Sequence, residues 1–387
     1  SVYYKEEKFR YLMSEDKKAK SLLNIGVTDI AGTGITAFFW FFLATLIEPG
    51  EYGQIFYYIA IVGMASQFVL IGSINTITVY TSKKIKIEST LYFLSLCLAA
   101  VASLVMILIF YKVDTIVLLF GYVIHGLTIG EILGKKSFFQ YTKYSITQKI
   151  LTLVLGLSFY FLFGIDGIIF ALGISYVGFS FILIKQFRNS KIDFGLLKNR
   201  TQFIFQNYII RIVEKAKEHL NQIVMAPFLG FVMLGNFSLL IQFVSVAMIL
   251  SHIVFKYTLP SDSRGQKNKK LKLYTLLISI FAAITGFIVL PYVIPTLFPK
   301  FIEIIEPARI IILSVIPLTV INILTSEHLG NERNRRLLIS KIISLSLFLA
   351  MILLLGTEFG LMGVTFGFLI SVIVEAICLI PINRKND

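Results

Sequence analysis

Long apolar runs separated by short polar connections dominate the chain. Each run has about 20 residues or more, the length at which a helix crosses a bilayer. This pattern predicts an all-α, polytopic membrane protein of about twelve transmembrane helices in two groups of six. The predicted spans are 23–47, 54–81, 89–110, 114–133, 145–163 and 165–184, followed by 203–228, 231–254, 273–295, 308–327, 337–356 and 360–381.

Composition supports a membrane protein. Of the 387 residues, 56% are hydrophobic and only 15% charged, against roughly 25% charged in a soluble domain. The net charge of +14 would suit a nucleic-acid partner, but the basic residues form short clusters between spans rather than one patch. We therefore expect no nucleic-acid partner. Both cysteines, Cys97 and Cys378, lie inside apolar runs, so we expect neither disulfides nor a metal or other cofactor.

The basic clusters mark one side of the membrane. Thirty of the 36 Lys and Arg fall near the termini, in the even-numbered connections or at adjoining helix ends, and only Lys112, Lys300 and Arg309 fall opposite. The positive-inside rule then predicts a multi-pass protein of the cell membrane with both termini in the cytoplasm. The expected parts are a cytoplasmic segment (1–22), a six-helix bundle (23–184), a cytoplasmic linker (185–202), a second six-helix bundle (203–381) and a cytoplasmic tail (382–387).

The two halves share a sequence pattern. The sixth span begins GIDGIIFALGIS (164–175) and the twelfth begins GLMGVTFGFLIS (360–371), with five identical positions at an offset of 196. Because each half has an even number of spans, both have the same orientation. The repeat therefore predicts a parallel pseudo-two-fold axis along the membrane normal, with a central cavity between the bundles.

The span 203–228 carries six ionisable residues within nine positions, from Arg211 to His219. An amphipathic helix lying on the membrane surface is the alternative to a span. If this segment did not cross, however, every later loop would change sides and the basic loops of the second half would face outward. We therefore expect residues 203–228 to cross the bilayer.

A polar stripe occupies an arc of about 100° on this helix. A charge at mid-bilayer costs about 2.5–3.5 kcal/mol, whereas a large aliphatic residue returns only about 0.3–0.6 kcal/mol. The stripe should therefore face a water-filled cavity or paired side chains, with ion pairs expected at i, i+3 between Arg211 and Glu214 and between Lys215 and Glu218. The stripe comprises Asn207, Arg211, Glu214, Lys215, Glu218 and Gln222.

Charges within membrane spans indicate a transport path, and the alternative is an ion-pair network that only holds helices together. Two further carboxylates, Asp29 and Glu375, lie inside predicted spans. A carboxylate at that depth needs a cation or a proton. Asp29 could pair with Arg211 across the halves, and either carboxylate could take a coupling ion, H⁺ or Na⁺.

Three segments resemble polysaccharide-export flippases. Residues 46–80 resemble their first outer loop and second helix, where a Pro, an acidic residue and a Tyr-Gly precede the helix. Residues 228–263 resemble their eighth helix, and residues 360–373 resemble their last helix. This Wzx-like branch belongs to the multidrug/oligosaccharidyl-lipid/polysaccharide (MOP) exporter superfamily. The resemblance implies a cationic central cavity and outward movement of polyprenyl-(pyro)phosphate-linked sugars by alternating access. It also implies that Arg211 and Lys215 contact the phosphate. The first two spans lack the Lys or Arg with which some relatives bind the phosphate, so the contribution of the N-terminal half to substrate binding stays open.

Two other functions are compatible with a polytopic membrane protein. A multidrug exporter of the same superfamily should favour an acidic cavity for cationic drugs. A membrane glycosyltransferase or polymerase would show a large outer loop or a clustered acid/base set, and neither is evident here. The sequence therefore favours a transporter rather than an enzyme. Its expected partners are the lipid-linked sugar, membrane lipids and a coupling ion.

Overall fold

The computed structural model describes residues 26–28, 30–71, 74–189, 191–198, 200–262, 268–330 and 334–380. Within these ranges seven helices are long and apolar enough to cross a membrane, or ten if each of three bent helix pairs forms one span. α10 (Thr201–Leu229) is an eleventh span whose charges lower its hydropathy. α16 (Asn334–Leu379) supplies a twelfth because its backbone breaks at Gly360. The predicted all-helical, twelve-span architecture is confirmed.

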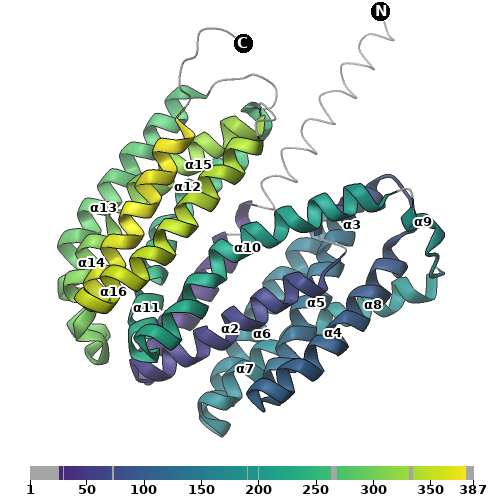
Figure 1. The fold of residues 1–387 in the computed structure, drawn as a ribbon, viewed down its shortest axis with the longest axis horizontal. Coiled ribbons are helices and arrows are strands. Elements are labelled where there is room, and N and C mark those ends of the chain that lie inside the picture. The colour runs from purple at the N-terminus through teal and green to yellow at the C-terminus, as the bar shows by residue number, and fades with distance from the viewer. Residues whose placement is uncertain are drawn as a thin grey trace, which may run out of the picture.

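The spans form two lobes, with α10 running between them (Figure 1). The N-lobe begins with the helix Gly26–Leu46, and a short helix, α9 (Gly195–Lys198), leads from it to α10. The other N-lobe helices are α2 (Pro49–Val69), α3 (Ile74–Ser82), α4 (Glu88–Phe110), α5 (Val113–Gly134), α6 (Phe138–Phe163), α7 (Ile165–Ile174) and α8 (Val177–Asn189). The C-lobe contains α11 (Phe231–Ala247), α12 (Ile249–Asp262), α13 (Lys269–Leu297), the 3₁₀-helix η1 (Pro299–Ile304), α14 (Ile305–Ile312), α15 (Val315–Gly330) and α16.

The internal repeat is visible in the backbone. Gly164 has φ 68° and ψ −149°, and Gly360, 196 positions later, has φ 58° and ψ −139°, a region that residues with a side chain rarely enter. Each glycine reverses the chain between two antiparallel spans. A Cβ on Gly167 would lie 2.5 Å from the carbonyl oxygen of Phe159, and one on Gly363 would lie 2.0 Å from that of Leu355. The same offset relates both contacts, so the two halves close their last hairpin in the same way.

The second span of each half is bent. The angle between α2 and α3 is 41°, and that between α11 and α12 is 50°. The sequence pattern predicted an unbroken run at both places. Apolarity sets the length of a span but carries no information about its curvature, so the bends could not be read from it.

The first helix begins and α16 ends at one end of the molecule, which we call the terminal end. Glycines bring the lobes together at the opposite end, which we call the distal end. There α2 packs against α11. A Cβ added to Gly53 would lie 1.9 Å from the carbonyl oxygen of Phe231, and one added to Gly235 would lie 1.8 Å from that of Pro49. The two backbones are therefore in contact, as small residues allow in membrane proteins.

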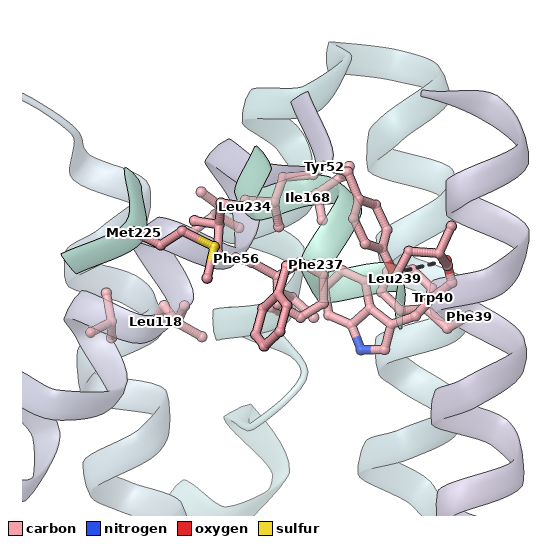
Figure 2. Packing of buried hydrophobic residues seen from close by; sticks show 14 of the residues in the cluster. Phe39, Trp40, Tyr52, Phe56, Leu118, Ile168, Met225, Leu234, Phe237 and Leu239 are labelled. Atoms are coloured by element: carbon pink, nitrogen blue, oxygen red, sulfur yellow. Dashed lines mark hydrogen bonds between the residues drawn. The ribbon is translucent and has the colours of Figure 1, made fainter. Parts of the chain in front are cut away.

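Aromatic side chains extend this contact across the lobes. Trp40, Tyr52 and Phe56 pack together in the N-lobe beside α11 (Figure 2). Tyr52 reaches Phe301 of η1, with ring centroids 5.7 Å apart. Each such pair contributes about 0.5–1.5 kcal/mol beyond its buried area. Two further ring pairs, of Phe41 with Phe243 and with Phe298, and the ion pair of Lys300 with Glu48 at 3.1 Å also cross the lobes. The distal end is thus closed by packed apolar groups.

Candidate functional site

The charged helix α10 lies between α2 on one side and α16 on the other. Its 29 residues extend for about 44 Å at 1.5 Å per residue, more than the roughly 30 Å hydrocarbon core of a bilayer. At its terminal end, the Tyr208 hydroxyl donates a hydrogen bond to the carbonyl oxygen of Phe68 at 2.7 Å. The packing on both sides fits a span between the lobes.

One side of α10 lines a cavity of about 210 Å³ facing the N-lobe. Gly63 of α2 makes room there for the His219 ring, because a Cβ on Gly63 would lie 2.5 Å from Nε2. The residues from α10 are Arg211, Lys215, Glu218 and His219, and the opposite wall includes Ser66, Gln67, Tyr122, His125 and Tyr176.

A larger cavity of about 530 Å³ adjoins the first, since both are lined by Ile74, His125 and Tyr176. Its walls come from the first helix and α6 of the N-lobe and from α11 of the C-lobe. The polar groups on these walls include Thr28, Thr33, Thr36, Ser145, Gln148, Lys149, Gln242 and Ser245. The two cavities together form a polar space reached by side chains of both lobes.

The charge of this space is positive. Among the described residues, three bases, Arg211, Lys215 and Lys149, line the two cavities, against one acid, Glu218. Glu218 forms an ion pair with Lys215. Among the residues that the structure describes, no carboxylate lies within ion-pairing distance of Lys149. The described lining of this space is therefore net positive, which favours an anion there.

The opposite side of the stripe is held by α16. Glu214 lies 3.9 Å from Arg211, which gives the first of the predicted i, i+3 pairs. Glu214 also lies 3.5 Å from Lys341 on the first half of α16. Lys217 forms an ion pair with Glu375 on the second half, and the Glu375 side chain is only 2% exposed. α10 therefore presents cations to the cavity and forms ion pairs with the C-lobe.

The predicted residues separate into groups. Arg211, Lys215 and Glu218 lie together on the cavity wall, whereas Glu214 and Glu375 are engaged with lysines. Asn207 and Gln222 are half-buried on α10 and are not among the residues lining either cavity. Asp29 lies outside the described residues. Substrate binding by the stripe and ion coupling by Asp29 or Glu375 stay predictions.

Three functional candidates were missed from the sequence. Lys149 and Lys341 lie inside the predicted spans 145–163 and 337–356, but each is within five residues of the start and was counted as a basic helix end. His125 has no other histidine or metal-ligand spacing near it in the sequence, so its pattern does not indicate a site. A signal for Lys149 existed, because it lies more than one helical turn inside its span, beyond Ser145 and Gln148.

Comparison with known proteins gives the class of fold. No family model matches the sequence, and no curated protein matches it. Among solved structures, the chain is similar to an inward-facing multidrug resistance MATE family transporter of the MOP superfamily, with TM-score 0.69, 16% identity and 91% of this chain and 92% of that chain covered. It is also similar to an outward-facing transporter of that description, with TM-score 0.62, 16% identity and coverage of 92% and 93%.

A MATE transporter in a bent conformation gives TM-score 0.61 at 16% identity and covers 93% of each chain. At such identities the likeness establishes the fold alone. The chain therefore has the two-lobed, twelve-helix fold of MATE transporters of the MOP superfamily, and the Wzx-like branch is a finer assignment that belongs with the proposed function.

Proposed function

We propose that this protein is a membrane transporter that moves a lipid-linked oligosaccharide from the cytoplasmic to the outer leaflet by alternating access. The observation that carries the proposal is the cationic central space, in whose described lining Arg211, Lys215 and Lys149 outnumber Glu218. A polyprenyl-(pyro)phosphate presents one or two phosphate groups. Guanidinium and ammonium groups bind phosphate by charge-assisted hydrogen bonds.

The closure of the distal end supports alternating access. With the Gly53–Gly235 crossing closed, the central space is separated from the distal side. The likeness to the inward-facing transporter, at TM-score 0.69, exceeds that to the outward-facing one, at 0.62. If both termini are cytoplasmic, as the positive-inside rule predicts, this conformation is the one that receives substrate from the cytoplasm.

In the proposed cycle, the phosphate enters between the lobes and contacts Arg211 and Lys215 from α10 and Lys149 from α6. The polyprenyl chain stays in lipid, because transferring a long hydrocarbon into a polar space is unfavourable. Rocking of the lobes then separates α2 from α11 and exposes the sugar on the distal side. Lys149 supplies a phosphate-binding cation from the N-terminal half, whereas the first two spans contain no Lys or Arg for this role.

A multidrug exporter is the second candidate, because two of the solved structures with this fold are described as multidrug resistance transporters. Such an exporter would take cationic or amphipathic drugs, for which Glu218 is an acid on the described cavity wall. The surplus of bases makes this weaker. A dye-efflux measurement separates the two candidates, since only a drug exporter would extrude a lipophilic cation.

We expect the double variant Arg211→Ala/Lys215→Ala to insert normally but to trap lipid-linked sugar on the cytoplasmic leaflet. Hydrogen bonds to charged groups contribute about 1.5–3 kcal/mol each, so losing two should weaken binding by about 100-fold or more. The measurement is leaflet-resolved accumulation of the lipid-linked sugar in cells that rely on this protein. Lys270→Ala, an exposed lysine of α13 away from both cavities, is the matched control. Normal export by the double variant would exclude the proposed role of these residues.

A further inference from the structure

A separate hollow opens at the terminal end of the N-lobe, where the α3–α4 and α5–α6 connections lie beside α8. Its volume is about 540 Å³, and it shares no lining residue with the two central cavities. Neither the fold likeness nor the transport cycle assigns it a role. It is lined by Thr81, Ser82, Lys84, Lys86, Glu88, Gly134, Lys135, Lys136 and Gln186.

Two of its lysines hold a backbone conformation that glycine usually takes. Lys84 has φ 58° and Lys136 has φ 55°. At each site the lysine N–H and the next residue's N–H bond back to the preceding helix, Lys84 to Thr81 and Lys136 to Leu133. This is the Schellman ending, whose left-handed position is most often glycine. A side chain there costs about 1 kcal/mol or more, and both of these lysines point to one hollow.

The hollow has surplus positive charge. Lys135 forms an ion pair with Glu131, whereas no carboxylate of the described chain pairs with Lys84, Lys86 or Lys136. The positive-inside rule accounts for lysines in these connections. The rule does not explain why two of these lysines occupy left-handed backbone positions around one hollow.

Glu88 adds an unsatisfied acceptor to this basic hollow. Its side chain is buried, and one carboxylate oxygen accepts a hydrogen bond from the Thr81 hydroxyl at 2.7 Å. The other oxygen is buried, and no donor within the described ranges reaches it. A buried acceptor in this state favours a ligand that brings a hydroxyl or another donor.

The hollow lies at the ends of helices that carry exposed apolar side chains toward the bilayer. Phe181 and Ile184 of α8 are 70% and 54% exposed; at 100° per residue they lie on other faces of α8 than Gln186, which lines the hollow. On α4, Phe93 is also exposed. A lipid headgroup held at this end of the spans would keep its acyl chains in the surrounding bilayer, whereas a free phosphate would gain nothing from the membrane.

We propose that this hollow binds the headgroup of an anionic phospholipid that carries both a phosphodiester and a hydroxyl donor, as phosphatidylglycerol does. Lys84, Lys86 and Lys136 contact the phosphodiester, and a headgroup hydroxyl donates to the free oxygen of Glu88. The site is independent of the transported substrate, and its lipid is a resident of the bilayer.

The test is titration of the purified full-length protein with phosphatidylglycerol, followed by native mass spectrometry. We expect Lys84→Gly/Lys136→Gly to weaken the tightest phosphatidylglycerol binding at least tenfold. Because glycine suits both left-handed positions, the thermal unfolding midpoint of this variant should be equal to or above that of the parent. Lys83→Ala is the matched control, since Lys83 is exposed and adjacent but does not line the hollow.

Unchanged phosphatidylglycerol affinity in the double glycine variant would overturn the proposal. Equal affinity for phosphatidylcholine, whose headgroup has no net charge and no hydroxyl donor, would also overturn it. Inorganic phosphate is the third probe. If millimolar phosphate fully displaces phosphatidylglycerol, the site takes a free anion and the lipid assignment is wrong.

Discussion

Alanine at Gly53 or Gly235 is expected to force the lobes apart at the distal end and to abolish transport. The added Cβ would lie 1.9 Å or 1.8 Å from a backbone carbonyl oxygen of the facing helix. A backbone cannot rotate away as a flexible side chain can, so α2 and α11 must separate. Overpacking of this kind costs about 1–3 kcal/mol or more. At the upper figure the population of the distally closed state falls about 100-fold relative to the open one.

The measurement is thiol labelling from the distal side at Phe298→Cys, a position only 3% exposed in the closed structure. The background lacks Cys97 and Cys378, both of which are free thiols. We expect slow labelling in the parent and fast labelling with either alanine. Gly50→Ala is the control at the same crossing, because its Cβ would meet only the Val232 side chain at 3.4 Å. Protection from the reagent together with normal export in the Gly235→Ala variant would contradict this account of closure.

Replacing Lys217 by Met is expected to destabilise the protein by about 3–5 kcal/mol, because it leaves the buried carboxylate of Glu375 without its cation. The double variant Lys217→Met/Glu375→Met should recover most of this loss, since it removes both charges and keeps the volume similar. The measurement is thermal unfolding of the purified single and double variants. If the single variant is as stable as the parent, the pair does not hold α10 to α16.

The same pair tests the prediction that Glu375 takes a coupling ion. If Glu375 exchanges a proton or Na⁺ during the cycle, the stable double variant should fold but export substrate without response to an imposed ion gradient. A double variant that still responds to the gradient would leave Glu375 with a structural role. Asp29 would then be the carboxylate to examine.

Much of the architecture was predictable from the sequence. Runs of apolar residues fix the number and length of the spans, and G-x-x-G at 164–167 and 360–363 identified the repeat because the chain must reverse there through a conformation that glycine tolerates. The i, i+3 pairs of α10 followed from helical periodicity alone. Local rules succeed where the interacting groups are near one another in the sequence.

Contacts between distant segments were not predictable. Lys341 and Glu375 meet α10 through tertiary packing, and no spacing in the sequence relates them to Glu214 or Lys217. Lys149 lies near the predicted start of its span, but α6 begins at Phe138, so this lysine is about three helical turns inside the helix, and the packing of the first helix and α11 places it on the cavity wall. The bend between α11 and α12 has neither a proline nor a polar residue at Ala247–Ile249, so the sequence offers no signal for it.

The central claim is that α10 crosses the membrane with its cations facing a water-filled, positive space. Lys215→Cys, in the background without native cysteines, tests both parts. Its reaction rates with an anionic and a cationic methanethiosulfonate reagent are compared with those of a free thiol. A field of one sign in a cleft raises the local concentration of opposite charges by about 10-fold or more. The substitution itself removes a positive charge, so a remaining preference for the anionic reagent underestimates the positive potential at Lys215 in the parent protein.

Ile209→Cys, 42% exposed on the apolar side of α10, is the control and should react slowly with both reagents. The account predicts that Lys215→Cys reacts readily and favours the anionic reagent about tenfold over the free-thiol ratio. A Lys215→Cys variant that is as unreactive as Ile209→Cys, or that favours the cationic reagent, would contradict it.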